Sequence, residues 1–251
     1  MRRGKRNESE FAVRPFEAER VWNVEEVPVL QARASVPEPV AEARQWRRVR
    51  SFYRLQGRAF FRYCQGELRP WAEAEYHAAR RNSAPLPCFQ ASLEFQETYR
   101  AGRLWSLYTE LRENAAPGAP MRRRWGDTWD LRAGYPVGLA DFFPPRVPWK
   151  RILLQLAAGE IELQEKRGLS RYHPDWRRRL RRWFNPRNYY LTPGGIAFYF
   201  PMYAIAPACE GIPTFLCPWD AEILCAQGGA PKGKNVGAWN GEPPLKPFRG
   251  D

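Results

Sequence analysis

Apolar positions along the chain follow two periods, and the period changes near residue 88. Between residues 46 and 64 the apolar side chains recur about every 3.6 positions, with arginines on the other faces. This pattern predicts a helix that follows a capping box at Ser35 and Glu38, and helical character that resumes from Pro70 to about Arg81. The apolar stripe of the first helix consists of Trp46, Val49, Tyr53, Phe60 and Cys64.

Downstream of residue 88 the period is two, which is typical of half-buried strands. Residues 89–96 alternate in this way, and residues 103–111 alternate again after the turn Arg-Ala-Gly-Arg at 100–103. The two segments therefore predict an antiparallel hairpin. A third strand is expected over 122–131, with Trp125, Trp129 and Leu131 on its core side. Upstream, residues 27–30 predict a short extended piece, because proline disfavours helix at the preceding residue.

The last third of the chain predicts two helices followed by a second hairpin. A helix is expected over 148–167, with Leu163 in its apolar stripe and Gly168 as its C-cap, and an arginine-rich helix over 174–183. Pro193 and Gly194 form a turn signal between two short apolar strands. A last strand over 213–217 and a short helix from Pro218 complete the pattern.

This order of elements predicts an α+β protein in which antiparallel β-hairpins pack against helices. It argues against a doubly wound sheet, because hairpins rather than single strands alternate with the helices. We expect two closely associated subdomains that divide near residue 144. The predicted parts are a basic flexible arm (1–24), an N-terminal subdomain of helix and antiparallel strands (25–144), a C-terminal α+β domain (145–226) and a flexible tail rich in glycine and proline (227–251).

Composition narrows the class of protein further. The 251 residues are 44% hydrophobic and include 11 tryptophans, which excludes wholesale disorder. The net charge of +13 favours nucleic acid, anionic lipid or an acidic partner, although solvated arginines on the surface would give the same number. The N-terminus has no apolar signal-peptide core, and no segment reaches the roughly 18 apolar residues of a membrane span. We therefore expect a soluble, cytoplasmic protein.

The five cysteines predict reduced, mostly buried thiols, because their number is odd and no C-x-x-C motif occurs. They are Cys64, Cys88, Cys209, Cys217 and Cys225.

A search for catalytic groups finds no complete constellation. His77 and His173 have no cysteine or histidine at metal-ligand spacing, and no nucleophile-elbow, P-loop or dinucleotide-binding motif occurs. A small hydrolase that uses Cys209 or Asp141 remains an alternative, although neither has an evident base. We predict that the protein is not an enzyme and has no catalytic, cofactor-binding or metal-binding residues and no cofactor.

The strongest electrostatic feature is WRRRLRRW at 176–183. Its arginines could contact the phosphates of a nucleic acid or another anionic partner, and its tryptophans could stack on bases. At helical spacing, however, Trp176, Leu180 and Trp183 or Phe184 share one stripe, which favours an amphipathic helix docked by its aromatic side chains. The candidate anion contacts are Arg177, Arg178, Arg179, Arg181 and Arg182.

The segment 188–219, NYYLTPGGIAFYFPMYAIAPACEGIPTFLCPW, resembles a bacterial domain found at the C-terminus of lysozyme-sensing anti-sigma factors (RsiV type). The same domain occurs in the non-catalytic region of certain peptidoglycan deacetylases (PdaC type). Residues 130–143, DLRAGYPVGLADFF, resemble a second segment of that family, and the likeness extends over residues 26–225. The matching motif positions include Tyr190, Gly195, Tyr203, Ile205, Ala206, Pro207, Gly211 and Pro218.

The resemblance implies a fold and a recognition role, and it carries no catalytic residue across. A histidine-containing loop of the family is replaced by ENAAPGAP at 113–120, and Ala208 stands where the family has tyrosine. The chain shows neither the transmembrane helix of the anti-sigma factors nor the catalytic domain of the deacetylases. Within the motif we expect Tyr203 and Ile205 to pin a buried crossover against the core, while Gly211 permits a turn.

These observations together predict a non-enzymatic recognition or interaction protein with an RsiV-like domain. Its expected partner is an unidentified protein or glycan. The alternative is a basic protein that associates with nucleic acid, weakly, through the arginine-rich helix at 176–183.

Overall fold

The computed structural model of the protein describes residues 12–40, 44–115 and 120–220. The larger sheet has strands in chain order, namely β1 (Val13–Val24), β2 (Val27–Pro39), β3 (Phe89–Ala101), β4 (Leu104–Asn114), β5 (Met121–Asp130) and β6 (Tyr135–Pro136). The smaller sheet has β7 (Tyr189–Thr192), β8 (Gly195–Tyr199) and β9 (Thr214–Pro218). The helices of the described ranges are α1 (Arg44–Tyr63), α2 (Arg69–Arg81), α3 (Trp149–Lys166) and α4 (Trp176–Trp183).

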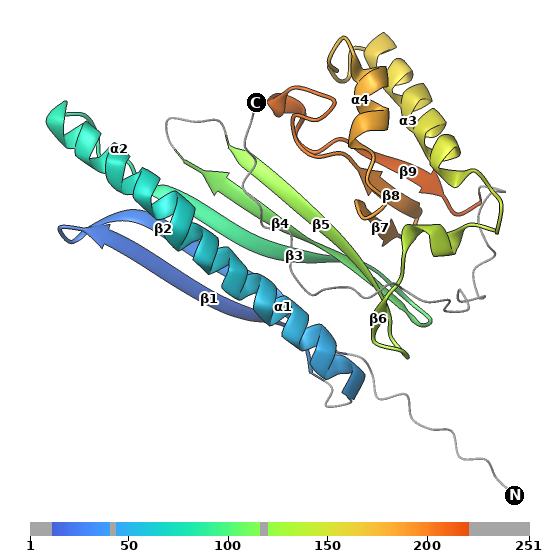
Figure 1. The fold of residues 1–251 in the computed structure, drawn as a ribbon, viewed down its shortest axis with the longest axis horizontal. Helices are drawn as coiled ribbons and strands as arrows, with labels where there is room; N and C mark the ends of the chain where they lie inside the picture. The colour runs from blue at the N-terminus through green and yellow to red at the C-terminus, as the bar shows by residue number, and fades with distance from the viewer. Residues whose placement is uncertain (1–11, 41–43, 116–119, 221–251) are drawn as a thin grey trace, which may run out of the picture.

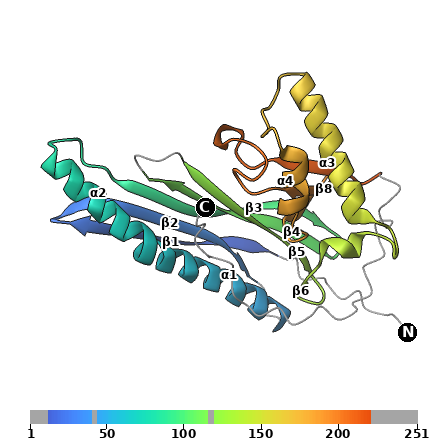
Figure 2. The same ribbon diagram turned by 45° about the horizontal axis from the view of Figure 1, so that its top comes forward.

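These elements stack in four layers. The α1 and α2 helices cross one face of the larger sheet, and the smaller sheet lies against the other face over β3, β4 and β5 (Figure 1, Figure 2). The α3 and α4 helices cover the outer face of the smaller sheet. The arrangement confirms the predicted α+β class.

The predicted flexible arm is wrong for residues 13–24, which form the edge strand β1. This strand pairs antiparallel with β2 along its whole length. The turn between them is made by Glu25 and Glu26, both with positive φ (48° and 68°). Such two-residue turns usually contain asparagine or glycine, so the sequence carries no recognisable hairpin signal. Residues 1–11 and the predicted tail at 227–251 lie outside the described residues.

The predicted capping box at Ser35 and Glu38 is also wrong, because both residues belong to β2. Ala32, Ala34 and Val36 face the core and keep the chain extended. β2 then pairs in parallel with β3, from Leu30↔Phe89 to Ala34↔Leu93. A parallel pair requires a long crossover, and α1 and α2 provide it. The larger sheet is therefore mixed rather than purely antiparallel.

The two predicted helical segments form one continuous rod. A π-helical turn, Cys64–Leu68, joins α1 to α2. Pro70 lies in the first turn of α2 and has no amide hydrogen to donate to the preceding turn. A local π-turn is a common way to accommodate such a change in the hydrogen-bond ladder, so the chain stays helical where the sequence suggested an interruption.

The core between α1 and the larger sheet is apolar and matches the predicted periods. Tyr53 and Val49 from α1 meet Trp105, Leu107 and Leu111 from β4, and all five side chains are fully buried. The predicted hairpin of β3 and β4 and the third strand β5 are confirmed. Burial of side chains of this size contributes roughly 1.5–3 kcal/mol each.

A second apolar cluster lies between the smaller sheet and α3 and α4. Ile196, Phe198 and Phe200 of the predicted hairpin are buried there, as expected. In α3 the buried residue near the C-terminus is Ile161, whereas Leu163 is exposed, so the predicted stripe is shifted there. Gly168 follows the C-cap Arg167 with a φ of +65° and ends the helix as predicted. Trp219 and Asp220 form a turn, and no helix from Pro218 is seen within the described residues.

The two sheets approach each other closely where β7 crosses β5. A Cβ atom on Gly126 would lie 1.9 Å from the carbonyl oxygen of Tyr189, so only glycine fits there. Beside it, the Leu191 amide donates a hydrogen bond to Ser106 Oγ (2.9 Å), and Ser106 Oγ lies 2.8 Å from Thr128 Oγ1. The sheet-to-sheet contact is thus made of hydrogen bonds and backbone packing rather than of apolar side chains alone.

Candidate binding groove

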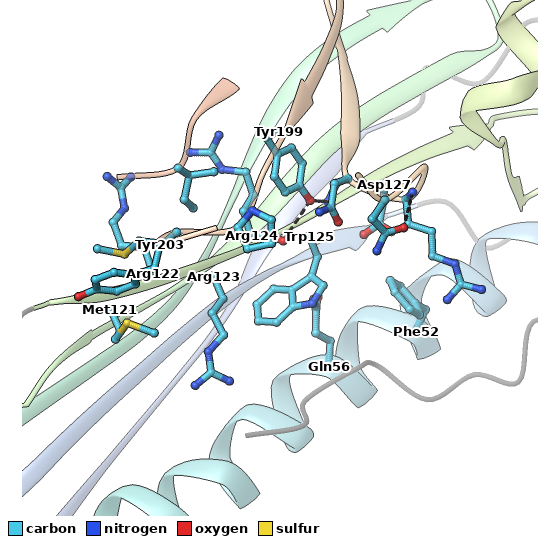
Figure 3. A pocket seen from close by; sticks show the side chains of 17 residues that line it. Phe52, Gln56, Met121, Arg122, Arg123, Arg124, Trp125, Asp127, Tyr199 and Tyr203 are labelled. Carbon is cyan, nitrogen blue, oxygen red and sulfur yellow. Dashed lines mark hydrogen bonds between the residues drawn. The ribbon is translucent and has the colours of Figure 1, made fainter. Parts of the chain in front are cut away.

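A cavity of about 420 Å³ lies along the free edge of β5, between α1 and the C-terminal segments 185–188 and 199–203 (Figure 3). Its volume is in the range of small-molecule and peptide-segment sites. We call this cavity the β5 groove. It brings together residues from five separate stretches of the chain.

Four aromatic side chains stand on the walls of the β5 groove. Phe52 of α1 and Trp125 of β5 line the side next to the long helix, and Tyr199, Tyr203 and Ile212 line the side next to the smaller sheet. Figure 3 shows Trp125 directed toward α1 and Tyr199 on the opposite side of the strand. Such walls offer flat apolar surface, and the tyrosines also offer hydroxyl groups.

A row of three arginines, Arg122–Arg124, runs along β5 within the groove. Because side chains alternate across a strand, Arg122 and Arg124 face the smaller sheet, where they bind Glu110. Arg122 Nη2 and Arg124 Nη2 each lie 2.6 Å from a Glu110 carboxylate oxygen, and Arg112 Nε lies 2.9 Å from Oε1. Burial would raise the pKa of Glu110, but the hydrogen bonds from the three arginines hold it below its ordinary value.

Arg124 is fixed more firmly than its neighbours. Its guanidinium lies 4.2 Å from the ring centre of Tyr108 and 5.8 Å from those of Tyr190 and Tyr199. Cation–π contacts of this kind add to the ion pair with Glu110. Arg124 is therefore part of the structural junction between the sheets as well as of the groove floor.

The third arginine faces the long helix. Arg123 lies 3.5 Å from Glu113 and 5.3 Å from the ring centre of Tyr63.

Arg187, from the segment after α4, is exposed at the groove and has no ion pair among the described residues. Four carboxylates, of Glu94, Glu110, Glu113 and Asp127, face five arginines in and directly behind the groove, so positive charge is in excess by one.

The backbone amides and carbonyls on the groove side of β5 are only partly hydrogen-bonded within the described residues. β4 pairs with one side of β5, and β6 pairs with the other side only at Trp129 and Asp130. Nearer the groove, the Tyr199 hydroxyl accepts a hydrogen bond from the Gly126 amide (2.9 Å) and donates one to the Arg124 carbonyl (3.0 Å). Tyr199 thus takes the position of a neighbouring strand at one point of this edge.

One carboxylate among the described residues lines the groove. Asp127 Oδ2 accepts a hydrogen bond from the Tyr53 hydroxyl (3.1 Å), and Trp129 Nε1 donates to the same hydroxyl oxygen (2.8 Å). Burial raises the pKa of Asp127 to about 6, and the hydrogen bond from Tyr53 offsets only part of that rise. Asp127 therefore titrates close to neutral pH.

Most residues of the predicted sequence motif have structural positions in the core, in the smaller sheet or in the turn after β8. Ile205 and Ala206 are buried in the second core, and Gly195 pairs with Pro218 between β8 and β9. Tyr190 lies in the contact between the sheets, 5.1 Å from the ring centre of Tyr108. The turn after β8 is continued by a short 3-10 helix, Ala208–Glu210, flanked by Pro207 and Gly211.

Tyr203 differs from the expectation of a core anchor. Its side chain is only half-buried and lines the β5 groove. The Ala204 amide donates to the Pro201 carbonyl (3.0 Å), and this tight turn places Tyr203 at a φ of +67°. Left-handed backbone turns the side chain away from the direction that a regular strand would give it, so of the two predicted anchors only Ile205 is buried.

The arginines of α4 are mostly engaged with nearby carboxylates. Trp176 and Leu180 are buried, which confirms the amphipathic pattern. Arg178 and Arg179 bind Asp175, and Arg177 binds Glu162 of α3. Arg181 and Arg182 are exposed to solvent. The segment therefore presents two exposed arginines without ion pairs among the described residues, not five.

The other candidate chemical groups are dispersed. His173 Nε2 lies 3.3 Å from the Tyr203 carbonyl oxygen, and Asp141 accepts a hydrogen bond from the Gly138 amide at the start of a short 3-10 helix, Leu139–Phe142. The described cysteines are all unpaired, but only Cys64 and Cys217 are buried, so the prediction of mostly buried thiols is wrong for half of them. Cys225 lies outside the described residues. No cluster of three metal-ligating side chains occurs among the described residues.

The C-terminal part of the chain matches a known protein family. Residues 140–220, less than half of the chain, match a family model described as a protein of unknown function, DUF3298. No curated protein matches the sequence. The predicted RsiV-like region overlaps this match, while its finer assignment to anti-sigma factors or deacetylases stays a prediction.

Two solved structures share the fold over most of the chain. A DUF3298-family protein from Bacteroides fragilis superposes with a TM-score of 0.63 at 14% identity, covering 86% of this chain and 94% of that one. A DUF3298-family protein from Pseudomonas aeruginosa gives a TM-score of 0.52 at 15% identity, covering 83% and 91%. At this identity the likeness establishes the fold alone. In the part of the chain that the structure describes, no helix is long and apolar enough to cross a membrane.

Proposed function

We propose that the protein is a non-enzymatic recognition module whose binding surface is the β5 groove and whose ligand is anionic. The observation that carries this proposal is the excess of arginine in an aromatic-walled cavity at an incompletely paired strand edge. Aromatic walls with a few convergent polar groups are the common composition of binding sites. Arginine is the side chain best suited to planar anions such as carboxylates.

The non-enzymatic part of the proposal rests on what lines the groove. Asp127 is hydrogen-bonded to Tyr53, which in turn receives the Trp129 indole N–H. Neither partner is a nucleophile activated by a base, as covalent catalysis requires. The resemblance of residues 188–219 to the RsiV-type and PdaC-type domain also supports recognition rather than chemistry.

A cytoplasmic setting belongs to the same proposal. Cys88 and Cys209 are exposed and unpaired, and exposed free thiols are typical of a reducing compartment. The alternative function, nucleic-acid binding through α4, has weaker support, because the arginines of α4 lie on a surface helix and line no part of the β5 groove.

A panel of defined probes tests the proposal. Poly-glutamate, lysozyme, soluble peptidoglycan fragments and duplex DNA are compared by biolayer interferometry on the full chain. Two charge-matched variants, Arg187→Glu at the groove and Arg182→Glu on α4, replace exposed arginines of the same kind. We expect poly-glutamate to bind, and Arg187→Glu to weaken its binding about tenfold while Arg182→Glu changes it less than about twofold.

Other outcomes decide between the alternatives. Lysozyme or peptidoglycan binding that Arg187→Glu weakens would support the groove and the RsiV-type or PdaC-type resemblance together. Binding of duplex DNA alone, lost in Arg182→Glu, would overturn the proposal in favour of α4. Failure of all four probes to bind would also overturn it.

A further inference from the structure

We infer that the β5 groove takes an acidic peptide segment in extended conformation, which adds as a strand to the free edge of β5. This inference rests on the proposed function and specifies its ligand. It is carried by the direction of the backbone groups on β5, by unpaired polar atoms beside them, and by the charge of the groove. Strand addition of this kind supplies affinity through main-chain hydrogen bonds and specificity through alternate side chains.

The backbone groups that face the groove follow from the strand alternation. On a β-strand the N–H and C=O of one residue point to the same side, and those of the next residue to the other. The Thr128 carbonyl accepts from Val137 and the Gly126 amide donates to Tyr199, so the even-numbered residues face away from β4. No register shift interrupts the pairing of β4 with β5. The N–H and C=O of Arg122 therefore also face away from β4, into the groove.

The Arg122 amide and carbonyl take part in no hydrogen bond among the described residues. The Arg124 amide likewise has no hydrogen bond among the described residues, whereas the Arg124 carbonyl accepts one from the Tyr199 hydroxyl. Tyr199 thus limits the free edge, and a peptide would pair from Arg124 toward Met121. Backbone groups that water alone satisfies are the usual template for strand addition.

Two buried side-chain atoms in the same groove also lack partners. Gln56 is only 4% exposed, and its Oε1 has no donor among the described residues. Its Nε2 donates to Thr109 Oγ1 (2.7 Å), which fixes the amide in place. Arg123 Nε is likewise buried without an acceptor. Buried polar atoms are rarely left unsatisfied, so an acceptor and a donor are available on the α1 side of the groove.

The charge of the groove selects the composition of the peptide. A strand added beside β5 would direct alternate side chains to two walls. Arg123 and Trp125 stand on the α1 wall, and Arg122 with Tyr203 stands on the opposite wall. Each wall thus combines a guanidinium with an aromatic ring, which suits acidic and apolar residues and disfavours basic ones.

A peptide series separates strand addition from side-chain binding alone. The probe is a fluorescein-labelled decapeptide of alternating glutamate and valine, titrated into the full chain and followed by fluorescence anisotropy. A matched peptide with N-methyl groups on alternate amides keeps every side chain but loses one hydrogen-bonding edge. We expect the N-methylated peptide to bind at least about tenfold more weakly. A lysine-for-glutamate peptide should not bind measurably.

A matched pair of variants separates the backbone amide of Arg122 from its side chain. Arg122→Ala removes the guanidinium and keeps the amide hydrogen. Arg122→Pro removes the guanidinium and the amide hydrogen, on the edge of β5 that does not pair with β4. We expect Arg122→Pro to bind the acidic peptide at least about tenfold more weakly than Arg122→Ala. Melting temperatures of the two variants verify that both are folded.

Amide hydrogen exchange by NMR gives a readout that folding does not confound. Addition of the acidic peptide to the wild-type chain should slow exchange at Arg122 and Arg124. It should leave Arg123 and Trp125 unchanged, because the ladder with β4 already protects their amides. Equal binding of the N-methylated peptide, or binding without slower exchange at Arg122, would overturn strand addition while leaving the proposed function standing. Groove binding of peptidoglycan fragments but not of the acidic peptide would overturn the choice of ligand.

Discussion

Residues 122–124 and residues 177–182 are both rich in arginine, but β5 and α4 place them in different settings. The β5 arginines lie in and beneath a cavity and gather around the buried Glu110. The α4 arginines lie on the outside of an amphipathic helix, and most bind carboxylates that are themselves exposed or half-exposed. Local density of charge is higher in α4, whereas the arginines of β5 line a cavity.

The pKa values of Asp127 and Asp175 also differ between the two settings. Burial raises the pKa of Asp127 in the β5 groove to about 6. Hydrogen bonds from Arg179 and Arg178 lower the pKa of Asp175 beside α4 to about 2. An arginine-rich segment on the surface thus stabilises its carboxylate, whereas the groove contains a carboxylate that no arginine stabilises directly. The environment of the arginines, rather than their number, thus distinguishes the binding surface that we propose from a solvated one.

The largest effect is expected from removal of the buried carboxylate. Glu110→Gln leaves the guanidinium of Arg124 buried without its ion pair, and we expect a loss of about 3 kcal/mol in the free energy of unfolding. The corresponding change beside α4, Asp175→Asn, should leave urea unfolding nearly unchanged, because its arginine partners are solvated. Equal losses in the two variants would show that the two clusters do not differ in burial.

A smaller and pH-dependent effect is expected at Asp127. Its pKa of about 6 in the folded protein lies above the value of about 3.9 in an unfolded chain. The folded state therefore binds the extra proton, and its stability falls as the pH rises from about 4 to about 6. Asp127→Asn keeps an acceptor for Tyr53 and should gain about 2 kcal/mol relative to the wild type over this range.

Unfolding experiments at a series of pH values check this sign. Any difference between Asp175→Asn and the wild type should be small and opposite in sign, because the lowered pKa of Asp175 favours the folded protein above about pH 4, this contribution is lost as the pH falls toward about 2, and solvent screens the exposed carboxylate. A constant difference between Asp127→Asn and the wild type across the series would show that Asp127 is solvated like a surface residue.

The smallest effect is expected on α4. Arg181→Glu combined with Arg182→Glu should change the free energy of unfolding by less than about 0.5 kcal/mol, because both side chains are exposed. Wild-type binding to duplex DNA should be weak and should disappear between about 50 and 200 mM salt, as counterion release requires. Fluorescence anisotropy across a salt series measures this, and tight binding at physiological salt that the double variant abolishes would make α4 the functional surface.

The fold was predictable wherever periodicity and burial coincide. The stripe from Trp46 to Cys64 and the alternation around Trp105 each have one apolar face, and each became the expected helix or strand. β1 was missed because Arg14 and Arg20 interrupt the face that carries Phe16, Ala18, Trp22 and Val24, and because its turn at Glu25 and Glu26 lacks glycine or asparagine. Ser35 and Glu38 have the spacing of a capping box, but tertiary pairing of β2 overrides that local signal.

The β5 groove was not predictable from the sequence, because it is assembled from distant segments. Phe52, Trp125, Arg187 and Tyr203 come together only after the two sheets have packed. One local signal did exist, namely that Arg122 and Arg124 lie on a strand whose opposite face carries the tryptophans. Two arginines on the inward face of a strand require a buried partner or a cavity, and here they have both.

The central claim, that the β5 groove and not α4 receives the acidic ligand, is tested most directly by photo-crosslinking. The alternating glutamate–valine decapeptide would carry a benzophenone side chain at its centre, and the attachment site on the full chain would be read by tandem mass spectrometry. Benzophenone reacts readily with methionine, and Met121 and Met202 both line the groove. We predict attachment at Met121, Met202 or their neighbours in β5 and in the turn after β8. Attachment confined to α4 (Trp176–Trp183), with Met121 and Met202 unmodified, would contradict this placement of the ligand.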